Sequence, residues 1–324
     1  MKFCTRRKFL KDASVSVAAP LFQGNLAGLA GLLSQTSAPK IQFPAEPRQR
    51  ISVSSYPFRE YVTGQHDARQ AHEKAASGAK MPLKDFAAHI SAKFNIHKVE
   101  PWSEHFLSLQ PSYLDEIRDA ASKAGSGFAN VAADGENSLY SSDSAERDRA
   151  AQFAKTWIDV ARHIGSPSVR INIAAARDAK PEAARVAEGL KPIADYAASR
   201  NIVVHLENDN PVSEDPFFII SVVEGANSPW IHALPDFGNS LAALPPEDAY
   251  RGLDQMFAHA YAISHVKDTA TTPAKRVVEV DLERIFAMAK KHNYKGVFSM
   301  EWETAGDVYA GTSKLVTITL KNLS

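Results

Sequence analysis

The amino-acid sequence predicts a single (β/α)8 barrel. After a Pro-rich linker that ends at about Pro47, short runs rich in β-branched residues alternate with longer amphipathic stretches. Eight such pairs fit within 324 residues, a length that suits either one α/β barrel or two modest domains. The unbroken alternation favours one barrel. A doubly wound open sheet is the main alternative, but no Gly-x-Gly-x-x-Gly follows the first expected strand.

Each expected strand is a short apolar run with β-branched residues and turn-forming residues near its ends. In chain order, these runs cover residues 50–56, 98–102, 127–132, 168–173, 202–207, 230–236, 262–267 and 296–301.

The expected helices follow these runs one for one. In residues 144–164 the helical period is clear, because Ala151, Ala154, Trp157, Ile158 and Ala161 fall on one face. The full set covers residues 83–95, 112–124, 144–164, 181–199, 216–226, 246–260, 282–292 and 307–323.

The N-terminus has the residues of a twin-arginine export signal. Arg6-Arg7 precedes a mildly apolar stretch rich in Ala, Val and Leu. Pro20, Gln23 and Asn25 interrupt this stretch, which is too short and too broken for a good membrane-spanning helix. We therefore expect a cleaved signal, the export machinery as a partner, and a periplasmic or otherwise exported protein. A disordered basic leader is the alternative.

The expected domain plan is a signal peptide over residues 1–38, a linker over 39–49 and the barrel over 50–324. The cleavage site is approximate, because Pro39 disfavours a cut directly after Ala38. The single cysteine, Cys4, lies in the leader, so the mature protein has neither a disulfide nor a thiol nucleophile. Twin-arginine export carries folded proteins, often with a metal already bound, and a metal enzyme fits that route.

The charge balance argues against polyanionic partners. Lys plus Arg and Asp plus Glu number 37 each, which gives a formal net charge of zero, and there is no basic tail. Nucleic acid and anionic membrane are therefore poor candidates for binding.

Four polar residues end consecutive strands in the second half of the chain. The fifth to eighth expected strands end at or near Glu207, Asp236, His265 and Glu301. These residues follow one another at intervals of roughly 30 residues, the length of a βα unit. In a barrel, the carboxyl ends of the strands converge on the active-site face. The sequence therefore predicts that the four side chains meet on one rim.

This group of side chains predicts a metal site. Three crowded carboxylates would repel one another and raise at least one pKa unless a cation lay among them. Three oxygen ligands and one imidazole suit one divalent ion, Mn²⁺, Mg²⁺ or Co²⁺, with Zn²⁺ as an alternative. Any one of these residues alone would more often be a salt-bridged acid or a hydrogen-bonded histidine, but their matching positions favour metal binding.

The same residues carry a resemblance to a known superfamily. The motifs are Leu206-Glu207-Asn208, Pro235-Asp236-Phe237-Gly238-Asn239, His265-Val266-Lys267-Asp268 and Ser299-Met300-Glu301-Trp302-Glu303. With them, the chain from about Ile51 resembles the sugar-phosphate isomerase/epimerase superfamily, the xylose isomerase-like barrels that include ketose 3-epimerases and inosose dehydratases. The resemblance implies that Glu207, Asp236, His265 and Glu301 hold the metal, and that Glu207 and Glu301 face opposite sides of a sugar.

Strand alternation adds candidates, because side chains two apart share a face. Lys267 lies with His265, and it resembles a substrate-facing lysine of dehydratase-like members; a buried ion pair with Asp268 or another acid is the alternative. His205 lies with Glu207 as a substrate contact or a core residue. Glu303 lies with Glu301 if that strand continues.

Three earlier residues and one later residue complete the candidate substrate contacts. Glu100 and Trp102 on the second strand, and Arg170 on the fourth, can face the barrel mouth. A salt bridge between Glu100 and Arg170, and simple packing of Trp102, are the alternatives. Asn239 stands where ketose 3-epimerases carry a histidine, which implies different substrate contacts.

The resemblance implies proton abstraction next to a carbonyl. One glutamate would remove the proton of a chelated keto-sugar, and the other would return a proton to the opposite face of the enediolate. An exported sugar isomerase or epimerase is the leading hypothesis. The alternative is a lyase or dehydratase of keto-sugars or keto-glycosides on the same metal site, with Lys267 assisting the departing oxygen. An endonuclease and a non-catalytic sugar-binding protein are less favoured.

Overall fold

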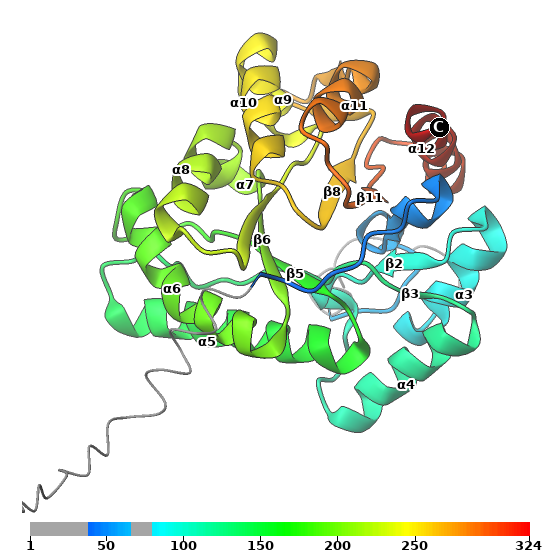
Figure 1. Ribbon diagram of the computed structural model, residues 1–324, viewed down its shortest axis with the longest axis horizontal. Coiled ribbons are helices and arrows are strands. Elements are labelled where there is room, and N and C mark those ends of the chain that lie inside the picture. Colours follow the sequence, from blue (N-terminus) through cyan, green and yellow to red (C-terminus); the bar gives the residue numbers. More distant parts are fainter. Residues whose placement is uncertain (1–37, 66–79) are drawn as a thin grey trace, which may run out of the picture.

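A computed structural model describes residues 38–65 and 80–324 of the chain. Apart from residue 38, the expected export signal lies outside the described residues, and so does Cys4. The described chain forms a ring of strands surrounded by helices (Figure 1).

The inner ring consists of short parallel strands. They are β1 (Ile51–Ser54), β2 (Lys98–Glu100), β3 (Gly127–Phe128), β4 (Ala132–Ala133), β5 (Ser168–Ile171), β6 (Val203–Glu207), β7 (Ile231–Leu234), β8 (Ile263–Val266) and β11 (Val297–Met300). The first strand, β1, pairs with both β2 and β11. Isolated bridges from Trp102 to Ala132 and from Asp236 to His265 connect the two hydrogen-bonded runs of strands. The predicted (β/α)8 barrel is confirmed.

The third barrel strand is broken, although the sequence predicted one run over residues 127–132. Its backbone changes partner within the break. Ala129 donates its N–H to Val99 on one side, whereas Val131 donates to Ser168 on the other. The strand is therefore divided into β3, which pairs with β2, and β4, which pairs with β5, and a single bridge from Trp102 to Ala132 links β4 back to the second strand.

The outer ring consists of amphipathic helices. They are α3 (Leu83–Phe94), α4 (Pro111–Lys123), α5 (Ser144–Ile164), α6 (Ala183–Arg200), α8 (Pro216–Ala226), α10 (Pro246–Ala258), α11 (Leu282–Lys291) and α12 (Val308–Leu323). Asp143 and Asp215 begin α5 and α8, because their side chains accept backbone N–H groups of the first turn. Asn95 and Asn201 end α3 and α6 in the left-handed conformation.

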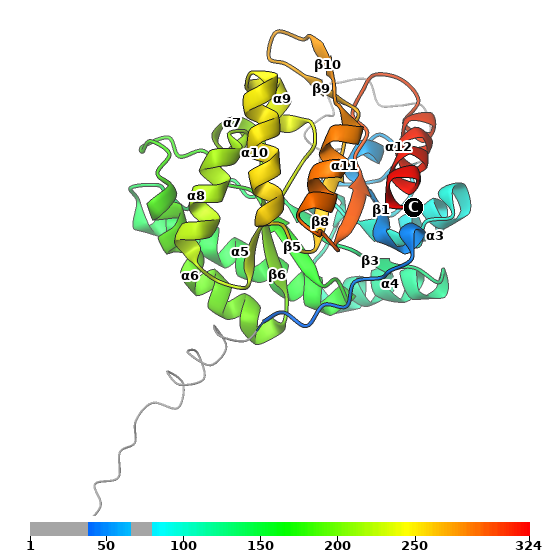
Figure 2. The ribbon, with the colours of Figure 1, turned by 45° about the horizontal axis from the view of Figure 1, so that its top comes forward.

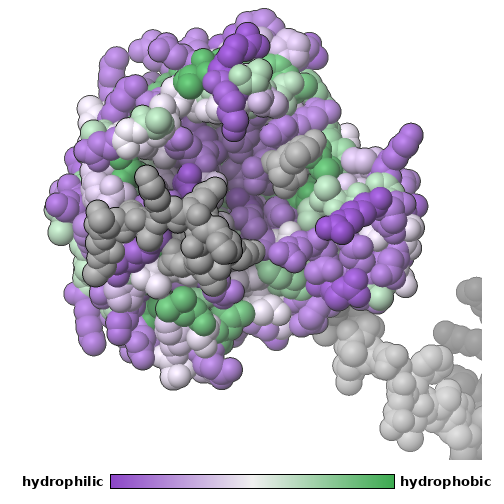
Figure 3. Space-filling view, turned by 180° about the vertical axis from the view of Figure 1, so that it is seen from behind, coloured by the Kyte–Doolittle hydropathy of each residue, from purple (hydrophilic) through white to green (hydrophobic). Residues whose placement is uncertain are grey.

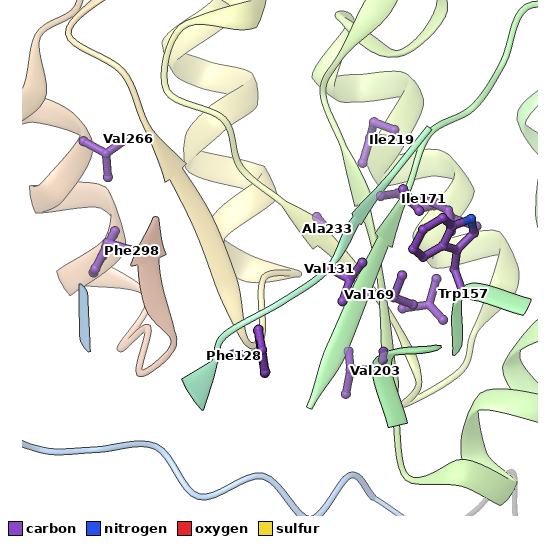
Figure 4. Packing of buried hydrophobic residues seen from close by; sticks show 14 of the residues in the cluster. Phe128, Val131, Trp157, Val169, Ile171, Val203, Ile219, Ala233, Val266 and Phe298 are labelled. Carbon is purple, nitrogen blue, oxygen red and sulfur yellow. The ribbon is translucent and has the colours of Figure 1, made fainter. Parts of the chain in front are cut away.

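The main hydrophobic core lies between the strands and the helices. Val169 and Ile171 of β5 pack there with Trp157 of α5 (Figure 4). A second cluster, Ala129, Leu234, Ile263 and Val297, is also buried. Ile263 shares the inward face of its strand with His265, so this cluster forms an apolar floor inside the ring. Burial of each such aliphatic side chain contributes roughly 1.5–3 kcal/mol.

The segment before the first strand crosses the amino end of the barrel (Figure 2). The Tyr261 hydroxyl donates to the Pro39 carbonyl at 3.3 Å, and the Phe43 ring packs edge-on to Tyr261. At the end of the segment, in the 3₁₀ turn η1 (Pro47–Arg50), Arg50 donates to the Tyr294 carbonyl at 2.8 Å. The segment therefore covers the face opposite to the carboxyl ends of the strands.

Other short elements lie in connections that the sequence left unassigned. The antiparallel strands β9 (Thr269–Thr271) and β10 (Val277–Glu279) form a hairpin that projects after β8 (Figure 2). The helices α7 (Asn210–Ser213) and α9 (Asn239–Ala243) follow β6 and β7, and the turns η2 (Tyr56–Phe58) and η3 (Ser103–His105) follow β1 and β2. Within residues 38–65 and 80–324, no helix combines the length and apolar character needed to cross a membrane.

Candidate metal centre

Four side chains from consecutive strand ends meet inside the barrel. The Nδ1 atom of His265 lies 2.8 Å from Glu207 Oε1, 3.3 Å from Glu301 Oε2 and 4.0 Å from Asp236 Oδ2. One ligand atom from each of these residues lies within 4.8 Å of all the others, and all four side chains are buried. The structure therefore brings together the four residues that the sequence placed on one rim.

Backbone hydrogen bonds hold these strand ends in register. Glu301 donates its N–H to the Val266 carbonyl, and His265 donates its N–H to the Pro235 carbonyl. Each bond joins a residue of the cluster to the neighbouring strand, so the side chains project inward at the same level.

Asp236 has one buried carboxylate oxygen that accepts no hydrogen bond. Its Oδ1 accepts the backbone N–H groups of Gly238 and Asn239, at 2.8 and 2.7 Å, but its Oδ2 has no hydrogen-bond partner. Burial, together with the charges of Glu207 and Glu301, raises the pKa of Asp236 to about 7, although Lys267 opposes this shift. A cation at Oδ2 would favour the charged form.

The imidazole of His265 is the positive group among these acids. Burial alone would lower the pKa of His265, but the surrounding carboxylates, Glu100 first, raise it well above its ordinary value. Burial would likewise raise the pKa of Glu301, but His265 and Lys267 hold it well below its usual range. The protonated imidazole thus balances negative charge that a divalent ion would otherwise balance.

Arg170, at the end of β5, forms one wall of the cluster. Its side chain is only 7% exposed, and its Nε lies 2.7 Å from Glu207 Oε2. It also forms ion pairs with Asp134 and, at 3.7 Å, with Asp209. These carboxylates, rather than Glu100, are its ionic partners. Burial opposes the charge on Glu207, but His265 and Arg170 together lower the pKa of that carboxyl.

Lys267 forms the opposite wall. Its Nζ lies 3.2 Å from Glu301 Oε2 and 3.4 Å from Asp236 Oδ2, and it pairs with Glu303. It also donates to Asn239 Oδ1 at 3.1 Å. The ion pair with an acid other than Asp268, one of the two alternatives that the sequence left open for Lys267, is present.

The other candidate substrate contacts lie at different depths. Trp102 is partly exposed, and its Nε1 donates to Asp134 Oδ2 at 2.6 Å. Glu100 and His205 are both 0% exposed, below the mouth. The Nε2 atom of His205 accepts the Ala262 N–H at 3.2 Å, and burial holds the pKa of His205 well below its ordinary value.

Three residues that the sequence analysis did not nominate also shape the centre. Asn208 donates to the Asp236 carbonyl at 3.0 Å and accepts the Asp236 N–H at 2.7 Å, which joins the ends of β6 and β7. Asp134, after β4, links Trp102 to Arg170. Burial and the charge of Glu303 raise the pKa of Tyr56 to about 12. Asp134 follows a strand end, so the strand-end rule that found Asp236 also applies to it.

The residues fit a hard divalent cation. Three carboxylate oxygens and one imidazole nitrogen lie within 4.8 Å of one another, and the Oδ2 atom of Asp236 is buried without a hydrogen bond. Hydrophilic residues line the visible walls of a hollow in one face of the molecule (Figure 3). The fold and the cluster therefore assign the protein to a class, the barrel proteins that have a candidate metal centre at the carboxyl ends of their strands.

Comparison with known families identifies the chain. It belongs to the xylose isomerase-like TIM barrel family, whose profile matches residues 89–317. No curated protein matches the chain in sequence.

Solved structures of low sequence identity share the fold. A xylose isomerase-like TIM barrel protein from Mycobacterium smegmatis, in complex with magnesium, is 16% identical with a TM-score of 0.63, over 84% of this chain and 96% of its own. A D-allulose 3-epimerase from Methylomonas sp. is 14% identical with a TM-score of 0.64, over 87% and 100%. A D-psicose 3-epimerase from Clostridium cellulolyticum H10, with D-tagatose, is 12% identical with a TM-score of 0.60, over 84% and 96%.

Proposed function

We propose that this protein is a metal-dependent sugar isomerase or epimerase that abstracts a proton next to a carbonyl. The observation that carries the proposal is the buried cluster of Glu207, Asp236, His265 and Glu301, with ligand atoms within 4.8 Å of one another. The family and the named neighbours support it, since two of those neighbours are ketose 3-epimerases and one holds magnesium. Mn²⁺, Mg²⁺ and Co²⁺ suit the ligands best.

A bound divalent ion would polarise the carbonyl oxygen and the adjacent hydroxyl oxygen of the sugar. This would acidify the C–H of the hydroxyl-bearing carbon next to the carbonyl. Glu207 and Glu301 are the proposed proton carriers. Their pKa values are lowered, because His265 and either Arg170 or Lys267 outweigh the effect of burial. Both glutamates are therefore ionised at neutral pH and able to accept a proton.

A neutral sugar fits this centre better than a phosphorylated one. The two buried cations beside the cluster, Arg170 and Lys267, already pair with carboxylates. An incoming phosphate would have to displace those acids or lie near their charges, which is unfavourable in a buried site. Trp102, which is partly exposed, is the residue that we propose to stack on the apolar face of the sugar.

The lyase reaction is the second candidate, and the position of Lys267 favours it. Its ammonium lies between Glu301 and Glu303, so it is placed to donate a proton to a departing oxygen after the C–H bond breaks. Such a reaction would begin with the same proton abstraction and end with loss of a β-substituent.

Export is part of the proposal. The Arg6-Arg7 pair and the apolar stretch after it support a twin-arginine signal over about residues 1–38, followed by a linker over 39–49 and a barrel domain over 50–324. The protein would then act on carbohydrates outside the cytoplasm.

The test is solvent deuterium incorporation. Purified protein loaded with Mn²⁺ is incubated in D₂O with a panel of keto-sugars and keto-glycosides, and products are followed by NMR and mass spectrometry. We expect deuterium at the carbon next to the carbonyl with the wild type and with the surface control Glu116→Gln, and none with Glu207→Gln or Glu301→Gln.

The product separates the candidates. A stereoisomer or structural isomer of equal mass supports an isomerase or epimerase, whereas an unsaturated or cleaved product supports a lyase. Tight sugar binding without any deuterium incorporation would contradict both reactions and indicate a binding protein.

A further inference from the structure

Glu100 contacts the side of His265 that faces away from the metal cluster. Glu100 ends β2, and its side chain is 0% exposed. Both of its carboxylate oxygens lie 3.0 Å from His265 Nε2. The other ring nitrogen of His265, Nδ1, faces Glu207 and Glu301. The imidazole is therefore held between one acid on its far side and the cluster on its near side.

The contact with Glu100 determines that the Nε2 atom of His265 carries a hydrogen. A carboxylate only accepts hydrogen bonds, so the Nε2–H must be the donor. The lone pair of a neutral ring then lies on Nδ1, the atom that points at Glu207, Asp236 and Glu301. Metal-bound histidines are commonly oriented by such a carboxylate, which also makes the ligand nitrogen more basic.

A buried chain of hydrogen bonds holds Glu100 in place. Asn130 donates its Nδ2 to Glu100 Oε1 at 2.7 Å, and Asn130 Oδ1 accepts the Ser168 hydroxyl at 2.7 Å. The Glu100 carboxylate only accepts hydrogen bonds, so it determines that the Asn130 amide turns its Nδ2 toward Glu100 and its Oδ1 toward Ser168. All of these side chains are 0% exposed, so no water competes for the bonds.

Other roles for Glu100 fit the structure less well. A substrate contact requires exposure to the mouth, and this side chain has none. A salt bridge would require the Glu100 carboxylate to contact the Arg170 guanidinium. The ionic partners of that guanidinium are instead Glu207, Asp134 and Asp209.

We propose that Glu100 is a positioning residue that orients His265 as a metal ligand, with Asn130 and Ser168 supporting it. The inference rests on the proposed metal-dependent function, because it assigns a role within the same site. It makes Glu100 a determinant of metal affinity rather than of sugar recognition.

The test is Mn²⁺ affinity, measured by competition with a fluorescent chelator well below the unfolding temperature of each variant. Loss of an outer-shell partner typically weakens metal binding 10- to 100-fold. We expect about this loss for Glu100→Ala and a smaller loss for Glu100→Gln, whose amide oxygen can still accept the Nε2–H. The matched control is Ser52→Ala, which removes a buried hydrogen bond to Ser299 in the same barrel interior without touching His265.

The outcomes separate this inference from the proposed function. Failure of the wild type to bind Mn²⁺ would overturn the proposed function, and this inference with it. Binding by the wild type with equal affinity in both Glu100 variants would overturn the positioning role alone. If Glu100→Ala does not fold, the isosteric Glu100→Gln decides, since unchanged affinity contradicts the proposal and reduced affinity with unchanged binding by Ser52→Ala supports it.

Discussion

Arg170 carries the only guanidinium among the described residues that touches the metal cluster, and three carboxylates depend on it. It contacts Glu207, Asp134 and Asp209 while being 7% exposed. Removal of one partner from a buried ion pair is costly, because the remaining charge stays buried without compensation.

We therefore predict that Arg170→Met lowers the free energy of unfolding of the metal-free protein by about 3 kcal/mol, the lower end of the usual range, because Asp134 and Asp209 are partly exposed to water. Urea denaturation measures this. Arg118→Met is the control, since Arg118 lies on the surface and should change stability little. Equal stability of Arg170→Met and the wild type would contradict the ion-pair account.

The protonation of Asp236 and His265 gives a pH prediction. Burial raises the pKa of Asp236 to about 7, and nearby acids raise the pKa of His265 well above its ordinary value. At neutral pH the metal-free protein thus holds a proton on His265 and, in about half of the molecules, on Asp236, and a metal must displace these protons. We predict release of at least one proton per Mn²⁺ ion and an affinity that falls as the pH is lowered through neutrality.

Calorimetric titration in buffers of different ionisation enthalpy measures this release. A binding enthalpy that does not depend on the buffer, or an affinity that stays constant across neutral pH, would contradict the assigned protonation.

At the residue scale, the sequence predicted inward-facing groups because alternation along a strand is local. Lys267 lies on the same side as His265 for that reason. Partners across the barrel were not predictable in the same way. Glu100 and His265 are 165 positions apart, and only closure of the ring brings them together.

At the scale of elements, the connection from β11 to α12 depends on a close approach at Gly311. A Cβ on Gly311 would lie 2.3 Å from two atoms of the Trp302 indole, between Glu301 and Glu303 in sequence. Such a contact forces the ring or the helix to move.

We predict that Gly311→Ala destabilises the protein by roughly 1–2 kcal/mol, because overpacking outweighs the better helix propensity of alanine. Thermal unfolding followed by circular dichroism measures the change. Gly127→Ala is the control, because a Cβ at Gly127 would meet nothing within 4 Å. If both variants unfold at the same temperature, the packing of α12 against Trp302 is not what the structure describes.

Element boundaries were predictable where capping residues mark them. The helices α5 and α8 match their predicted ranges, and Asp143 and Asp215 begin them. The broken third strand was not predicted, because its two halves pair with strands elsewhere in the chain and the local pattern contains no information about those partners. The β9–β10 hairpin was also not predicted, although its two strands pair with each other across a short connection.

At the scale of the whole molecule, eight repeats of strand and helix predicted the closed ring, and closure explains the site. The pairing of β1 with β11 brings Glu301 back beside the earlier strands, and the bridge from Asp236 to His265 joins the two sheet segments at the cluster itself. The apolar floor of Leu234, Ile263 and Val297 lies beneath the polar layer. The barrel thus places charged groups together at a level where water is largely excluded.

X-ray diffraction from crystals grown with Mn²⁺, with data collected at the manganese absorption edge, tests the proposed metal site most directly. We predict one strong anomalous peak among Glu207, Asp236, His265 and Glu301, at about 2.0–2.2 Å from an atom of each, the range of oxygen and nitrogen ligands to small divalent ions. Crystals that show no peak there, or these four side chains turned toward separate regions, would contradict it.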